Sequence, residues 1–175
     1  MIAIILCNLY AMSQINLSYE NLSYFSILHQ HGFLFLWGSL NASWFFYTTN
    51  QIFHYSGYTS KKEHFILILS TLMLFISVLL PYQPDTYPTL SQLHILCSFL
   101  GTITYAFLLL WFHYYLSLFY PKINQKGFIF YLTLMFFCLL QYITYGCVNG
   151  YMECGFSIGM CFYLNFLLTS ITSHQ

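Results

Sequence analysis

Long runs of apolar residues follow one another along this chain, and polar residues gather in the short segments between them. A helix rises about 1.5 Å per residue, so about 20 apolar residues cross the hydrocarbon core of a bilayer. The runs that approach this length are residues 31–54, 64–80, 90–120, 127–147 and 153–172. Residues 1–12 form a further apolar run, which we interpret as a short or truncated first span. The pattern predicts one integral membrane domain over residues 1–175, an all-α bundle of six transmembrane spans.

Prolines and glycines mark the predicted ends of these spans. Pro81 stops the run 64–80 and Pro121 ends the run 90–120, because proline cannot continue the hydrogen-bonded ladder of a helix. The glycine-rich turn GCVNGYMEC separates the last two runs. We therefore expect short loops between antiparallel neighbours.

Composition supports the same class and excludes others. Only 5% of the 175 residues are charged, against about 25% in soluble domains, and mean hydropathy is +0.67. The net charge is zero and arginine is absent from the sequence, so neither a nucleic-acid surface nor a bidentate phosphate clamp can be formed. The expected partners are membrane lipids and, as a further option, a second copy or another membrane protein.

The four lysines predict the orientation. Lys61 and Lys62 fall between the second and third spans, and Lys122 and Lys126 between the fourth and fifth. Short loops rich in lysine stay on the cytoplasmic side, so we expect both loops there. Both termini are then cytoplasmic if residues 1–12 cross the membrane, whereas the N-terminus is outside if they lie in the interface.

Small residues at helical spacing are expected to mark helix contacts, because helices in lipid associate by close backbone packing. The candidate packing positions are Gly155 and Gly159 in the last span, Ser39 and Ser43 in the second, and Gly101 in the fourth.

Three amides lie within predicted spans, where an unpaired polar group costs several kcal/mol. They are Asn41, Gln141 and Asn165, and we expect them to face one another or water. One interpretation is interhelical hydrogen bonding. The other is a polar path or ligand site, to which His94 would also belong.

Histidines and acids near the predicted outer surface form a candidate metal set of His29, His31, His94, Asp85 and Glu153, since imidazole and carboxylate suit Zn, Cu or Ni. No pair has helical ligand spacing, and loop-bonded histidines are the alternative interpretation. Haem between His31 and His94, or between His54 and His113, is disfavoured because about 28 Å of helix separates His94 from His113. No cofactor is therefore predicted.

His94 and two cysteines allow more than one interpretation. His94 follows Pro88 near a helix N-terminus, so a neutral, hydrogen-bonding imidazole is expected, tying down the preceding loop or receiving a ligand. Cys147 and Cys154 bracket the last turn and would form a disulfide only in an oxidising compartment; otherwise they are free thiols.

One stretch suggests a family. Residues 79–110, LLPYQPDTYPTLSQLHILCSFLGTITYAFLLL, place His94 and then Cys97, Ser98 and Gly101 at the start of the fourth span. Together with the six-span order, this resembles the DRAM-like membrane family and its bacterial relatives. The resemblance implies a link to autophagy or lipid-anchor handling in eukaryotes. The acidic residue expected in the sixth span is absent, where GFSIGMCFYLNF stands, so we transfer no activity.

A Walker loop and paired intramembrane carboxylates are absent from the sequence. The predicted function is therefore a non-enzymatic membrane or interaction component. The alternatives are a small transporter or channel with a path through the three amides, and a metal or haem redox protein.

Overall fold

The computed structural model describes residues 1–28 and 30–174, and every regular element in them is a helix. The helices are α1 (Ile2–Gln14), α2 (Tyr24–Ile27), α3 (His31–Ser56), α4 (Lys61–Leu79), α5 (Pro88–Phe119), α6 (Pro121–Tyr145) and α7 (Gly150–Thr172). The all-α class predicted from the sequence is confirmed. Two of the helices, α5 and α6, begin with proline, whose missing N–H is not needed at the first helical position.

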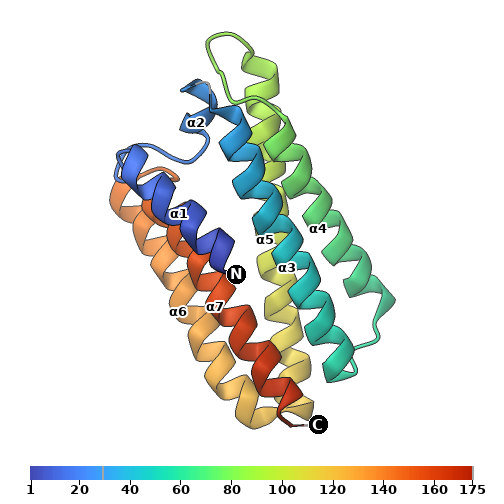
Figure 1. The fold of residues 1–175 in the computed structure, drawn as a ribbon. Coiled ribbons are helices and arrows are strands. Elements are labelled where there is room, and N and C mark those ends of the chain that lie inside the picture. Colours follow the sequence, from blue (N-terminus) through green and yellow to red (C-terminus); the bar gives the residue numbers. More distant parts are fainter. Residues whose placement is uncertain (29, 175) are drawn as a thin grey trace.

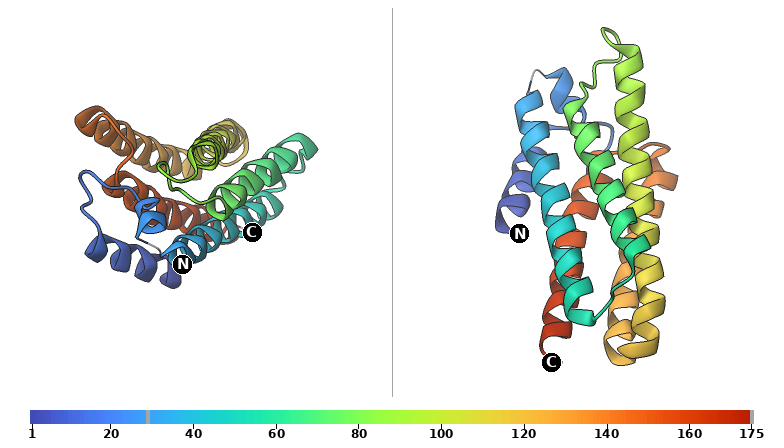
Figure 2. Two further views of the ribbon diagram at one scale, coloured as in Figure 1. Left: turned by 90° about the horizontal axis from the view of Figure 1, so that it is seen from above. Right: turned by 90° about the vertical axis from the view of Figure 1, so that its right-hand side faces the viewer.

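Five long helices form a closed ring (Figures 1 and 2). Helix α3 packs on α4, α4 on α5, α5 on α6, α6 on α7, and α7 returns to α3. The α4–α5 pair has the most extensive contact in the ring and the α5–α6 pair the least. Helix α1 lies in the groove between α3 and α7 and covers only part of the bundle's height (Figure 1).

Four helices, α4 to α7, are long and apolar enough to cross a membrane. Helix α3 has sufficient length at 26 residues, but polar residues such as Asn41, Thr48 and Thr49 lie on its buried side. Helix α1 has 13 residues, about 20 Å of rise, which is shorter than the roughly 30 Å hydrocarbon core. The described residues therefore support a membrane protein with four membrane-capable helices, and the count of six spans remains a prediction.

The lysine-bearing helix starts lie at one end of the bundle. The α3–α4 and α5–α6 connections are both at the lower end in Figure 1, next to the C-terminal end of α7. Gly57, in the left-handed conformation with φ of 73°, ends α3 there. The α4–α5 and α6–α7 connections and the segment from α1 to α2 lie at the opposite end.

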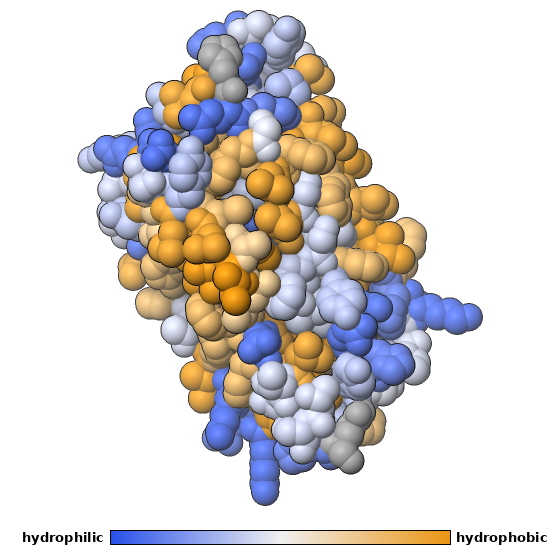
Figure 3. Space-filling model, viewed as in Figure 1, coloured by the Kyte–Doolittle hydropathy of each residue, from blue (hydrophilic) through white to orange (hydrophobic). Residues whose placement is uncertain are grey.

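The surface between the two ends is apolar. Large hydrophobic side chains such as Phe65, Phe107, Trp111, Phe136 and Ile143 are each more than half exposed. Figure 3 shows apolar residues over the middle of the molecule, with hydrophilic residues gathered toward both ends. Water would not solvate such a belt, whereas lipid tails would.

Glycines lie where helices approach most closely. A Cβ on Gly159 would meet the Leu134 side chain of α6 at 2.5 Å, and one on Gly155 would overlap Phe137. A Cβ on Gly101 would lie 3.1 Å from the Ser70 carbonyl oxygen of α4. These three glycines let α7 approach α6 and α5 approach α4.

One of the two serines predicted to pack on the second span needs correction. Ser43 is exposed, whereas the Oγ of Ser39 is buried without a hydrogen-bond partner. The close approach of α3 to α4 occurs at Gly38, where an added Cβ would overlap the side chain of Val78. Ser43 lies away from this contact because it is offset from Gly38 by about 140° around the helix.

Candidate functional site

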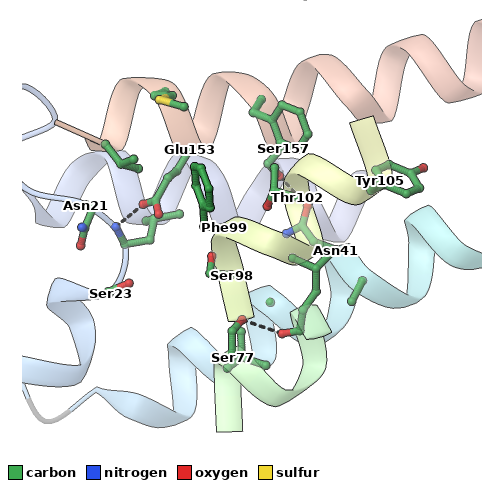
Figure 4. Close-up of a pocket in the computed structure, with 18 of the residues that line it drawn as sticks. Asn21, Ser23, Asn41, Ser77, Ser98, Phe99, Thr102, Tyr105, Glu153 and Ser157 are labelled. Atoms are coloured by element: carbon green, nitrogen blue, oxygen red, sulfur yellow. Dashed lines mark hydrogen bonds between the residues drawn. The ribbon is translucent and has the colours of Figure 1, made fainter. Parts of the chain in front are cut away.

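An apolar cavity of about 370 Å³ lies inside the upper half of the bundle (Figure 4). Its walls come from α3, α5 and α7, with smaller contributions from α4, α6 and the segment before α2. Small side chains leave the space open, because residues of their size cannot fill the distance between the helix axes. They are Gly38, Ala42, Ser98, Thr102, Ala106 and Ser157.

Two stacked rings close the lower end of the cavity. The ring centroids of Phe45 on α3 and Tyr105 on α5 are 5.6 Å apart, with the planes 6° from parallel. The Tyr105 hydroxyl and the Thr49 Oγ1 are hydrogen-bonded at 2.6 Å. Buried aromatic pairs of this kind stabilise a core beyond their buried area, so the floor is a fixed part of the fold.

A chain of hydrogen bonds joins three helices beside the cavity. The Ser157 hydroxyl donates to Asn41 Oδ1 at 2.6 Å and accepts from Asn8 Nδ2 at 2.8 Å. Trp37 Nε1 donates to Asn8 Oδ1 at 3.2 Å. These bonds link α1, α3 and α7 where Asn41, Ser157 and Trp37 line the cavity.

Polar groups gather at the upper end of the cavity. The backbone N–H of Leu22 donates to Glu153 Oε2, which binds the segment before α2 to the first turn of α7. The ring of His94 bonds to two other segments: Nδ1–H donates to the Ser77 carbonyl at 2.6 Å, and Nε2 is hydrogen-bonded to the Ser23 hydroxyl at 2.8 Å. A carbonyl can only accept, so Nδ1 carries a proton, and both ring nitrogens of His94 have a partner within the protein.

The cavity reaches the apolar surface along α5. Ile95, Phe99 and Ile103 line it and are also exposed, with 57% of the Phe99 surface accessible. Met135 and Cys138 of α6 also line the cavity. The exposed residues of the α5 wall are apolar, so the cavity meets the outside at an apolar part of the surface.

The three amides singled out from the sequence do not converge. Asn41 lines the cavity, whereas Gln141 and Asn165 do not. Gln141 Oε1 is buried without a hydrogen-bond partner, and Asn41 pairs with Ser157 rather than with either amide. The expected polar path through all three is therefore not formed.

The metal set is not assembled in the part of the chain that the structure describes, where no group of three His, Cys, Asp or Glu residues could hold an ion. His31 lies 3.4 Å from the Ser26 hydroxyl, Asp85 is exposed in a loop, and both nitrogens of His94 are bonded. His29 lies outside the described residues. The described histidines of the set bond instead to serines of α2, of α4 and of the segment before α2.

The haem pairing is also contradicted on the His113 side. Its Nδ1 bonds to Asn124 Oδ1 at 2.8 Å and its Nε2 to the Tyr163 hydroxyl at 2.7 Å, so neither nitrogen is free to ligate iron. Cys147 is exposed and Cys154 is fully buried, and both are free thiols.

Exposed charged residues surround a second hollow, at the opposite end of the molecule. It measures about 380 Å³ and lies between the start of α6 and the end of α7, with Lys122, Lys126 and His174 on its walls. All three side chains are exposed, which is how solvated charges at a membrane surface lie.

Replacing Ser157 by alanine is expected to destabilise the bundle by roughly 1 kcal/mol, because interhelical hydrogen bonds in membranes contribute about 0.6 kcal/mol on average and Ser157 makes two. Thermal unfolding in detergent measures the effect. Ser117→Ala is the matched control, since the exposed Ser117 bonds only within its own helix. Equal melting temperatures for the two variants would show that the chain of bonds contributes nothing.

In the part of the chain that the structure describes, the fold is all-helical, with four membrane-capable helices and an apolar cavity between the helices. No family model, curated protein or solved structure matches the chain.

Proposed function

We propose that this chain is a multi-pass integral membrane protein that binds an amphipathic, lipid-like molecule and has no catalytic role. The observation that carries the proposal is the apolar cavity of about 370 Å³, whose exposed wall on α5 consists of the apolar Ile95, Phe99 and Ile103. Sites for small molecules occupy about 300–1,000 Å³ and are mostly apolar with a few placed polar groups, as here.

The chemistry of the walls selects a ligand with an alkyl tail. Leu34, Phe45, Phe99 and Phe156 supply apolar surface, and the polar groups are confined to one side and the upper end. A tail entering from the bilayer leaves one apolar phase for another, and its contacts with the walls replace those it made with lipid. A hydrated ion would find no continuous polar lining through the bundle, so the geometry favours binding over transport of ions.

Binding of dodecanol to the purified protein in lipid nanodiscs tests this proposal. Native mass spectrometry should detect one saturable site on the protein, and nanodiscs without protein should show only partitioning. Failure to observe a saturable component would overturn the proposal. Flux of dodecanol between vesicle leaflets above the protein-free rate would change the proposal from binding to transport.

We also propose that the lysine end is cytoplasmic. Lys61 and Lys62 in the first turn of α4 and Lys122 in the first turn of α6 lie at one end of the bundle, as the positive-inside rule requires for loops of one side. Cys147, exposed in the α6–α7 turn, lies at the other end and is a built-in marker.

Labelling with an impermeant maleimide tests this orientation. Cysteines at Lys61→Cys and Lys122→Cys should react only from the cytoplasmic side of sealed vesicles, and Cys147 only from the opposite side. Reaction of positions 61 and 122 from opposite sides would contradict both the orientation and the bundle's arrangement in the membrane.

The resemblance to the DRAM-like family remains a prediction. The apolar cavity agrees with the lipid handling that the resemblance implies. We also propose that the protein contacts a second copy of itself or another membrane protein.

A further inference from the structure

We infer that Glu153 recognises the ligand's head group, and that this group carries an ammonium: the cavity takes a single-tailed amine, head at Glu153 and tail toward Phe45 and Tyr105. This inference rests on the proposed function and specifies its ligand class. It is carried by a carboxylate in an apolar cavity that lacks a protein counter-charge.

The position of Glu153 is fixed by its surroundings. It lies in the first turn of α7, where the helix dipole favours a negative charge, and the Leu22 N–H donates to its Oε2. Figure 4 shows the carboxylate at one end of the cavity, near Asn21 and on the side of Ser98. Its Oε1 has no hydrogen-bond partner in the described part of the chain, although Glu153 lines the cavity.

Among the described residues, no lysine lies near this carboxylate. The lysines occupy the starts of α4 and α6 at the far end of the bundle, and the sequence has no arginine. His94 shares the cavity wall, but both of its ring nitrogens are bonded elsewhere, to Ser77 and Ser23. A carboxylate oxygen beside apolar walls is costly to leave without a hydrogen-bond donor, so a ligand donor would stabilise it.

A ligand ammonium would satisfy these groups together. It would donate to Glu153 Oε1 and, with three N–H groups, also to the oxygens of Asn21 or Ser98, which line the same end. The alkyl tail would then follow the apolar walls down to the stacked Phe45 and Tyr105 rings. An anionic head group would be repelled by Glu153, so a fatty acid of the same length should bind poorly.

Binding of three ligands that share one tail tests the inference: dodecylamine, which is protonated at neutral pH as a lysine side chain is, dodecanol and dodecanoate. Wild-type protein in zwitterionic nanodiscs should bind dodecylamine about tenfold more tightly than dodecanol, which corresponds to about 1.4 kcal/mol, and dodecanoate most weakly. Glu153→Gln should remove the preference for the amine and leave dodecanol binding within about twofold. Glu153→Asp should retain the preference.

Asp85→Asn is the matched control, since it removes the same charge from an exposed loop at the same end of the bundle. It should preserve the preference for dodecylamine. An equal affinity of the wild type for amine and alcohol, or a preference that survives in Glu153→Gln, would overturn the inference and leave the proposed function intact. Absence of saturable dodecanol binding would overturn the proposed function itself. The wild-type series decides the question even if Glu153→Gln does not fold.

Discussion

Dodecanol binding should fall by at least about tenfold when Ser98 is replaced by phenylalanine, a loss of about 1.4 kcal/mol or more. Ser98 lies on the α5 wall of the cavity, between the polar upper end and the opening at Phe99. A phenylalanine ring there would occupy the space proposed for the head group and the first carbons of the ligand tail. Native mass spectrometry of the nanodisc-embedded variant measures the loss.

Ser117→Phe is the matched control for this variant. Ser117 lies on the same helix but is exposed on the outer surface, so the added ring would contact lipid. Its dodecanol affinity should equal that of the wild type. Unchanged binding in a folded Ser98→Phe variant would show that the saturable site lies elsewhere.

A large loss of stability is expected for Gly101→Leu. The position faces α4, where a Cβ would lie 3.1 Å from the Ser70 carbonyl oxygen and 3.1 Å from Met73 Cβ. Neither atom is the free end of a flexible side chain, so the helices must separate to admit a leucine. Overpacking of this kind costs about 1–3 kcal/mol. The α4–α5 contact is the most extensive in the ring, and the variant should melt well below the wild type in detergent.

Gly32→Leu provides the comparison, because Gly32 is exposed in the first turn of α3 and a Cβ there would have no neighbour within 4 Å. Leucine favours a helix more than glycine does, so this variant should be as stable as the wild type or slightly more stable. If Gly101→Leu melted together with Gly32→Leu, the close approach of α4 and α5 would be contradicted.

The helices could be predicted from the sequence because length and apolarity alone determine them. The run 64–80 became α4 at Lys61–Leu79, and the run 90–120 became α5 at Pro88–Phe119, with prolines at the expected boundaries. The predicted start of one helix was less accurate, because α6 begins at Pro121 rather than near residue 127. Its first turns contain the polar residues Lys122, Asn124 and Lys126, so apolarity does not indicate them.

The cavity could not be predicted in the same way, because it depends on which faces of the helices meet. Asn8 and Ser157 belong to the hydrogen-bond chain with Asn41. Nothing in the sequence indicates that an asparagine and a serine so far apart along the chain form a hydrogen bond. Glu153 was singled out as a metal ligand candidate, and the structure instead places it at the cavity's polar end. The sequence shows an acidic residue at the start of an apolar run, which marks Glu153 as unusual. It does not show that an apolar cavity lies beside this residue.

Fluorescence quenching of Trp37 by 12-bromododecanol tests most directly the central claim that an alkyl ligand occupies the interior of this bundle. Trp37 lines the cavity, whereas Trp111 is exposed on the outer surface. In a variant that keeps only Trp37 (Trp44→Phe, Trp111→Phe), quenching should saturate at low ligand concentration and be reversed by excess dodecanol. A variant that keeps only Trp111 should show weaker quenching that rises in proportion to the ligand in the bilayer. Proportional, non-saturating quenching of Trp37 would contradict the account.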